Sequence, residues 1–197
     1  TFSRRAYTIY RKKLPEYDQL LTGNVIFQNR VKGIGHMSKE TAIGYGVTGP
    51  SGRGSNYSCD IRKIAPYGAY DKVQFNEILE TGCDTLARYK VRMGEMWESL
   101  SILEQLVDNI PEGDFTAKMK PIITLPAGEY LQRVETARGE LAVYAVSDGN
   151  KSPLRMRFRT PNFSNLFVMN EITAGHKIAD LIAISGSLDL VIPDIDR

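Results

Sequence analysis

A long periodic stretch near the middle of the chain, residues 81–109, leaves few options for its fold. Apolar side chains recur in it at alternating spacings of three and four positions: Leu86, Tyr89, Met93, Met96, Leu100, Leu103 and Val107. This spacing places an apolar stripe along one α-helix and indicates packing against other helices. Thr81 and Asp84 form a capping-box pattern at its start, and Pro111 stops it. We therefore expect one long helix with a buried seam, formed above all by Leu86, Met93, Leu100 and Leu103.

Beside this seam runs a stripe of polar residues with helical spacing: Asp84, Arg88, Arg92, Glu95 and Ser99. Opposite charges three or four positions apart can pair along a helix. The interpretation we favour is a solvated face of ion pairs. In the alternative, the stripe is buried and fixes the register between helices, because buried charges must be paired.

Shorter elements precede the long helix. Residues 4–24 predict one helix, or two short helices divided before Pro15. Residues 25–35 predict a short strand and a turn, and residues 37–46 predict a short helix that begins at Ser38. The chain therefore starts as a mainly helical region.

The segment 47–75 is rich in Gly, Ser, Pro and Tyr and has no period, so it predicts a long loop, a feature that is often functional. Arg53 stands among glycines and serines, and Asp60 and Arg62 follow at a spacing of two. Arg53 could pair with an anion or with another subunit. The interpretation we favour is an ordered loop in which Asp60 and Arg62 pair with each other.

After the long helix the period changes from helix to strand. Three segments predict short antiparallel strands (130–137, 140–148 and 154–160), and two amphipathic helices follow them (163–175 and 176–187). Helices, then a small antiparallel sheet, then helices again indicate an α+β fold with a helical bundle core.

We expect a single domain over residues 1–197. Within it, residues 1–115 are mainly helical, residues 125–160 form the small sheet, and residues 161–197 form helices and a buried C-terminal tail. This division follows the change of period along the sequence.

The last residues, SLDLVIPDIDR (187–197), interleave charges with apolar side chains. An unpaired ion inside a protein costs several kcal/mol, so a charged tail enters a core only when its charges are matched. We therefore expect this tail to be ordered and to run into the helical core. Asp189 and Arg197 should each be paired with an opposite charge or with backbone groups.

A second charged motif, ETARGEL, occurs at residues 135–141. Arg138 stands in it between Glu135 and Glu140. An arginine flanked by two acids usually has a structural partner, but it could also project into a cleft.

Composition excludes several classes of function. The net charge is only +2 and the basic residues are spread along the sequence, which argues against a nucleic-acid partner. Cys59, Cys83, His36 and His176 form no metal-binding motif, so we expect no bound metal. No apolar stretch reaches membrane-spanning length. Neither a catalytic triad nor a Walker or dinucleotide-binding motif is present, so we expect no catalytic side chain.

Several segments together resemble one family: LLTGNVIF, AIGYGVTGPSGRGSNYSCDIRKIAPYGAYD, GCDTLARYKVRMGEMWESL, VETARGELAVYAVSDGNKSPLRMRFRTPNFSNL and IADLIAISGSLDLVIPDIDR. They look like the D-type (quinone-site, 49 kDa-type) subunit of respiratory NADH:quinone oxidoreductase, complex I, in order along nearly the whole sequence. The resemblance implies the fold of nickel–iron hydrogenase large subunits. It also implies that the sequence corresponds to the C-terminal portion of the 49 kDa-type subunit.

The same resemblance implies roles for individual residues. Hydrogenase large subunits end in D-P-C-x-x-C, and on that pattern Val191 and Asp194 stand where the cysteines would be. Without thiolates the protein could not hold a nickel site. In the complex I relatives the vacated cavity is similar to the end of the quinone channel, so Arg138, Asp189 and Val191 would lie near the quinone head group. Structural residues of the cavity would be Arg53, Asp60, Arg62 and Arg197, the last anchoring the tail.

The implied function is that of a complex I subunit, in a translocase that couples electron transfer to quinone with proton translocation. The protein itself would bind no cofactor; quinone would be the substrate, and NAD and the iron–sulfur clusters would belong to partner subunits. Implied partners are the iron–sulfur subunit at the quinone site, a C-type subunit and a membrane-arm subunit. The implied location is peripheral, on the cytoplasmic side of the bacterial inner membrane, or alternatively on the matrix or stroma side of an organelle membrane.

Two alternatives stay open. The protein could be a non-catalytic scaffold of the 49 kDa-type subunit, or the equivalent subunit of a related ferredoxin- or F420-linked membrane complex. In the relatives a longer N-terminal part carries the His and Tyr proposed to protonate the reduced quinone. That part is absent from this sequence, so we expect the isolated protein to be inactive.

Overall fold

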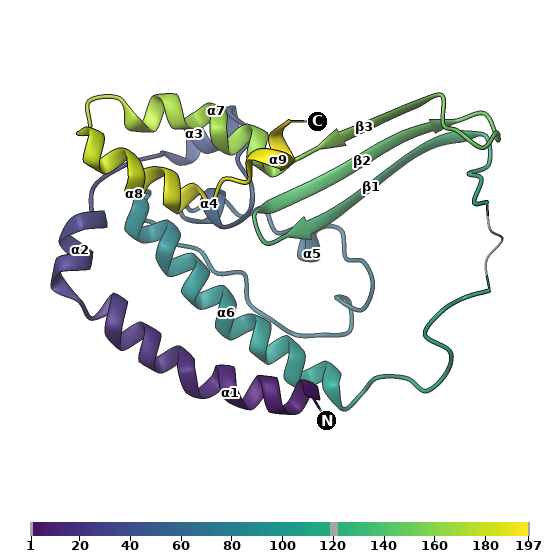
Figure 1. Ribbon diagram of the computed structural model, residues 1–197, viewed down its shortest axis with the longest axis horizontal. Helices are drawn as coiled ribbons and strands as arrows, with labels where there is room; N and C mark the ends of the chain where they lie inside the picture. The colour runs from purple at the N-terminus through teal and green to yellow at the C-terminus, as the bar shows by residue number, and fades with distance from the viewer. Residues whose placement is uncertain (1, 119–121, 197) are drawn as a thin grey trace.

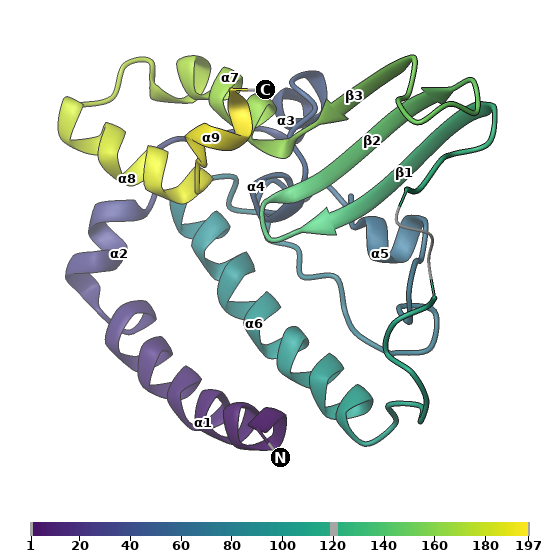
Figure 2. The ribbon, with the colours of Figure 1, turned by 45° about the vertical axis from the view of Figure 1, so that its right-hand side comes forward.

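The computed structural model describes residues 2–118 and 122–196. Its elements in chain order are α1 (Phe2–Tyr17), the π-helix η1 (Asp18–Thr22), α2 (Val25–Val31), α3 (Lys39–Gly44), α4 (Gly49–Arg53), α5 (Ile61–Ile64), α6 (Thr85–Val107), β1 (Gly128–Thr136), β2 (Gly139–Ser147), β3 (Arg155–Arg159), α7 (Pro161–Thr173), α8 (Ile178–Leu188) and α9 (Ile192–Ile195). In both views α6 lies between α1 and the sheet, and α7, α8 and α9 gather at one end of the sheet (Figures 1 and 2). The predicted α+β fold is confirmed.

The first predicted helix continues past Pro15 and then changes from an α-helix to a π-helix. Pro15 lies inside α1, and the π-helical turn η1 follows α1 directly. A proline removes one amide donor and crowds the carbonyl four residues earlier, which favours a local change of helical register. The Gly23 amide closes the wide turn on the Asp18 carbonyl oxygen at 3.1 Å. A division into two helices before Pro15 is therefore wrong.

The strand predicted at residues 25–35 is also wrong, because this segment forms helix α2. The Asn24 side chain caps the helix by accepting hydrogen bonds from the amides of Ile26 (2.9 Å) and Phe27 (3.2 Å). The β-branched Ile26 suggested a strand, but its side chain is 82% exposed and packs in no sheet. The cap therefore decides the local structure. Ser38 caps α3 as predicted.

Helix α6 confirms the long central helix but begins later than predicted. Its N-cap is Asp84, not Thr81. The Asp84 carboxylate accepts hydrogen bonds from the amides of Ala87 at 2.8 Å and Gly33 at 2.7 Å. The second bond joins α6 to the segment that follows α2, so a tertiary contact selects this cap over the one expected from local sequence.

Only part of the predicted apolar seam of α6 is buried. Met93 and Leu100 are buried, whereas Met96 and Leu103 are 39% and 47% exposed. Arg88, from the polar stripe, is fully buried instead. Both α4 and α8 contact α6 and cover part of this stripe. The solvated-face interpretation is therefore wrong for the centre of the stripe, and the alternative of buried charges holds there.

This burial pattern makes a testable distinction between two leucines of α6. Leu100→Ala should lower the free energy of unfolding by roughly 2–5 kcal/mol, because it truncates a core side chain. Leu103→Ala removes the same atoms from a side chain that is 47% exposed, and should cost less than about 1 kcal/mol. Urea-induced unfolding of both variants gives the comparison. Equal losses would mean that the whole seam is buried in solution, against this structure.

The segment 47–75 is not one long loop, which corrects that prediction. It contains the helices α4 and α5, and every residue of α4 is buried. Gly49 starts α4 with φ at +68°, and a Cβ there would lie 2.4 Å from the Gly139 Cα. Two glycines therefore let the backbone of α4 touch the turn between β1 and β2, an approach that larger residues would block.

The sheet is antiparallel, with the strand order β1-β2-β3. Thr136 pairs with Gly139 across a tight turn, which carries Arg138 at its tip. The hydrophobic core lies near this end of the sheet and is made by residues Met37, Ala42, Val47, Val168, Ile172, Ile184 and Leu188. Within residues 2–118 and 122–196, no helix is both long and apolar enough to cross a membrane.

Candidate functional site

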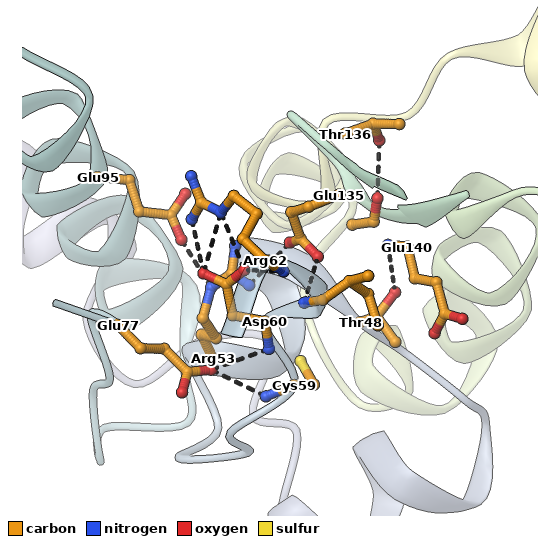
Figure 3. A network of polar contacts seen from close by, with 12 residues as sticks. Thr48, Arg53, Cys59, Asp60, Arg62, Glu77, Glu95, Glu135, Thr136 and Glu140 are labelled. Atoms are coloured by element: carbon orange, nitrogen blue, oxygen red, sulfur yellow. Dashed lines mark hydrogen bonds and ion pairs between the residues drawn. The ribbon is translucent and has the colours of Figure 1, made fainter. Parts of the chain in front are cut away.

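A network of buried charges is centred on Arg53, at the C-terminal end of α4 (Figure 3). The Arg53 side chain is 2% exposed, and it donates hydrogen bonds to two carboxylates. Its Nε contacts Glu95 Oε1 of α6 at 2.7 Å, and its Nη1 contacts Glu135 Oε1 of β1 at 2.8 Å. One guanidinium thus connects three elements. The idea that Arg53 pairs with another subunit is therefore wrong, because its charge is matched within the same polypeptide.

The two carboxylates share one counter-charge. Burial raises the pKa of both Glu95 and Glu135, and the Arg53 guanidinium opposes this shift through its charge and its hydrogen bonds. The neighbouring Asp60 carboxylate also raises the pKa of Glu135. One guanidinium therefore keeps both buried carboxylates hydrogen-bonded.

Asp60 and Arg62 pair with each other, as their spacing predicted. Arg62 Nη2 donates to Asp60 Oδ2 at 2.6 Å, and Arg62 Nε donates to Asp60 Oδ1 at 2.9 Å. The Arg62 guanidinium also lies over the Phe75 ring, 4.8 Å from its centroid. A separate bond joins α5 to β1: the Ile61 amide donates to the second Glu135 oxygen at 3.2 Å.

The cysteines show no arrangement for nucleophilic chemistry. Cys59 is buried, and burial raises the pKa of its thiol to about 12. Burial also raises the pKa of Cys83. A neutral thiol is a poor nucleophile and a poor metal ligand. In the described part of the molecule, no three His, Cys, Asp or Glu side chains are grouped to hold a metal ion; that the protein binds none stays a prediction.

Arg138 contacts Asp189, which ends α8, in agreement with the resemblance that places both at one cavity. Its Nε donates to the Asp189 carbonyl oxygen at 3.0 Å, and its Nη2 donates to Asp189 Oδ1 at 3.2 Å. Asp189 ends α8 in the left-handed conformation, with φ at 54°, and redirects the backbone there. The acids next to Arg138 in the sequence pair elsewhere: Glu135 with Arg53, and Glu140 with Arg133.

The C-terminal tail is only partly buried, which corrects the prediction that it enters the helical core. Leu188 lies in the core, but the described residues after it are half-buried or exposed. Asn162, a buried residue in the first turn of α7, ties the tail to that helix. Its Nδ2 donates to Asp194 Oδ2 at 2.7 Å, and its Oδ1 accepts from the Val191 amide at 3.3 Å. The predicted pairing of Arg197 lies outside the described residues.

Two neighbouring cavities flank the Arg138–Asp189 pair. The smaller cavity has a volume of about 280 Å³, and its lining includes Arg138, Asn162, Val191 and Asp194. The larger has a volume of about 460 Å³, and its lining includes Arg53, Arg62, Arg92, Glu95, Glu135 and Asp189. Thr136, at the turn that carries Arg138, lines both cavities.

The structure therefore brings most of the predicted site residues into one region. Arg138 and Val191 line the smaller cavity, and Asp189 lines the larger one beside Arg53 and Arg62. Sequence reasoning did not assign three further lining residues to a site: Arg92, Glu95 and Asn162. The polar stripe of α6 was the available signal for the first two, whereas no local pattern marks Asn162.

Comparisons with known proteins identify relatives over nearly the whole sequence. The family model for the respiratory-chain NADH dehydrogenase 49 kDa subunit matches residues 3–125 and 114–197. The C/D subunit of NADH-quinone oxidoreductase from Bacteroides thetaiotaomicron is 53% identical over 182 residues, which are 92% of this chain and 34% of the relative. The D 2 subunit from Opitutus terrae is 50% identical over 95% of this chain and 47% of its own length. The D subunit from Desulfotalea psychrophila is 47% identical over 95% of this chain and 50% of its own length.

This chain corresponds to only part of each relative. Nearly all of this chain aligns with each of them, yet it spans between 34% and 50% of their lengths. The similarity therefore concerns one part of a longer protein.

Proposed function

This chain belongs to the family of the 49 kDa subunit of respiratory-chain NADH dehydrogenase, and we propose that it forms part of the quinone-binding region of an NADH–quinone oxidoreductase. In this role it receives no electrons on its own side chains. It positions the quinone next to a partner subunit that carries the terminal iron–sulfur cluster, in a complex that couples electron transfer to proton translocation. Position and polarity are what a protein contributes to such redox chemistry.

The position of Arg138, Asp189 and Val191 supports this role above all. They lie at two neighbouring cavities of about 280 and 460 Å³, and the larger is within the range of roughly 300–1,000 Å³ that small-molecule sites take. Arginine N–H groups donate to carbonyl oxygens and stabilise the negative charge that develops when a quinone is reduced. The Glu95 and Glu135 carboxylates lie at the larger cavity, where they can exchange protons.

The partners follow from the same role. NAD and the iron–sulfur clusters belong to other subunits, and quinone is the substrate. A C-type subunit is an expected neighbour, and the relative that is named as a C/D subunit supports this pairing. A membrane-arm subunit completes the quinone region, so the protein lies peripherally on the cytoplasmic side of a bacterial inner membrane.

Two substitutions in the assembled oxidoreductase test this function. Asp189→Asn keeps the shape of the side chain but removes the charge that holds Arg138, so quinone reduction should fall about tenfold, as expected for the loss of one charge-assisted hydrogen bond. Val191→Met narrows the smaller cavity and should change inhibitor sensitivity more than turnover. The measurement is quinone reduction by NADH, compared with reduction of an artificial acceptor that bypasses the quinone site.

Asp148→Asn, in the exposed turn between β2 and β3, is the matched control and should leave both rates unchanged. If assembled enzymes carrying Asp189→Asn and Val191→Met keep unchanged quinone kinetics and inhibitor response, the tail is structural and the site assignment fails.

A further inference from the structure

Arg92 of α6 has one side-chain nitrogen without a partner. Its Nη1 donates to the Arg88 carbonyl oxygen at 3.0 Å, within the same helix. Its Nη2 is buried and has no hydrogen-bond partner among residues 2–118 and 122–196. A buried donor without an acceptor costs about 1–3 kcal/mol, so this arrangement is unfavourable unless another molecule supplies the acceptor.

The neighbouring acids are already engaged. Glu95 accepts a hydrogen bond from Arg53 at 2.7 Å, and Asp189 accepts one from Arg138 at 3.2 Å. Burial lowers the pKa of Arg92, and the nearby positive charges of Arg138 and Arg53 lower it further, whereas Asp189 and Glu95 oppose the shift. The hydrogen bonds of these two neighbouring carboxylates to arginines thus go to Arg53 and Arg138, not to Arg92.

Arg92 lines the cavity of about 460 Å³ described above. We propose that Arg92 is a ligand-binding residue: when a molecule occupies this cavity, the Arg92 side chain rotates so that its buried Nη2 faces the cavity and donates a hydrogen bond to a neutral carbonyl oxygen of that molecule. That oxygen belongs to the quinone head group. This identification of the molecule rests on the proposed function.

The charges of the lining favour a neutral acceptor over an anion. Three arginines (Arg53, Arg62 and Arg92) face three carboxylates (Glu95, Glu135 and Asp189), so the formal charge of these groups sums to zero. A phosphate or a carboxylate would gain no net attraction from a lining whose charges cancel, so its cost of desolvation would not be repaid. Tyr70, Met96 and Ala137 supply apolar surface in the same lining, which suits an aromatic ring that carries carbonyl groups.

Arg92→Met in the assembled oxidoreductase tests this role. Methionine fills similar space without a donor, so the KM for a short-chain soluble quinone should rise about 10- to 100-fold, the factor that corresponds to one hydrogen bond from a charged donor. The melting temperature should stay the same or rise, because the variant removes a buried donor that the protein itself leaves unpaired. Arg92→Gln, which keeps a neutral N–H donor, should recover part of the affinity.

Lys90→Met is the matched control, since Lys90 is a cation on the same helix that is exposed and lines neither cavity. It should leave the KM unchanged, and no variant should alter reduction of an artificial acceptor upstream of quinone. A lower melting temperature for Arg92→Met with an unchanged KM would show a structural role and overturn the inference. If Asp189→Asn or Val191→Met changes quinone kinetics while Arg92→Met does not, the inference fails and the proposed function stands. If none of the three changes them, both fail.

Discussion

Replacing Arg53 by methionine should lower the free energy of unfolding by about 3–5 kcal/mol, the typical cost of removing one partner from a buried ion pair. Arg53 is the only hydrogen-bonded cation that the described residues show for either Glu95 or Glu135. Without it, neither buried carboxylate keeps a hydrogen-bonded cation, and only the charges of Arg62 and Arg92 still act on Glu95. Urea-induced unfolding at neutral pH measures the loss.

The matched control is Arg133→Met. Arg133 also pairs with a glutamate, Glu140, but its side chain is 38% exposed. An exposed pair contributes about 0–1 kcal/mol, so this variant should lose far less stability.

The loss in Arg53→Met should depend on pH. Burial raises the pKa of Glu95 and Glu135, and removing Arg53 raises it further, because the guanidinium lowers it in the native protein. A group whose folded pKa is raised stabilises the folded state fully below its unfolded pKa, and this contribution disappears as the pH rises through the folded pKa. The difference between variant and native protein should therefore be small in acid and grow towards neutral pH. A difference that is independent of pH would contradict the buried network.

A second large effect is expected from Gly49→Ala. Gly49 has φ at +68°, and a Cβ there would lie 2.4 Å from the Gly139 Cα and 2.6 Å from the Arg138 carbonyl oxygen. Both neighbours are backbone atoms, so the contact can be relieved only by separating α4 from the turn that carries Arg138. Backbone strain and overpacking together should cost about 3–5 kcal/mol in thermal or urea-induced unfolding.

Gly68→Ala separates the two causes. Gly68 has a similar φ of +60°, but nothing lies within 4 Å of the position that its Cβ would take. It should show the conformational cost alone, about 1 kcal/mol. If the two variants lose the same stability, the close approach of Gly49 and Gly139 does not exist in solution.

The elements with long, regular patterns could be predicted from the sequence. Helix α6, the three strands and the helices after them have periods that local physics is sufficient to produce. The failures occurred where a distant contact or a single cap decided the outcome. Asn24 capped a helix where Ile26 suggested a strand, and Asp84 was selected as the cap of α6 by the Gly33 amide, which lies far from it in the sequence.

The site was predictable in part for the same reason. The pairing of Asp60 with Arg62 is local, and the spacing indicated it. The burial of the α6 polar stripe depends on α4 and α8, which pack against α6 from other parts of the chain, so no periodicity of the helix could reveal it. The contact between Arg138 and Asp189 was expected only because of the resemblance to a known family, and the cavities on either side of it exist only in the folded protein.

Photoaffinity labelling of the assembled oxidoreductase with an azido-quinone tests most directly whether quinone occupies these cavities. Labelled peptides from this protein should come from the walls of the two cavities, around Arg92 to Ser99, Glu135 to Leu141 and Asp189 to Asp194. An excess of unmodified quinone should suppress the labelling, and Val191→Met should change its distribution. Labelling of this protein that falls only outside those segments, or that excess quinone leaves unchanged, would contradict the assignment of the quinone site.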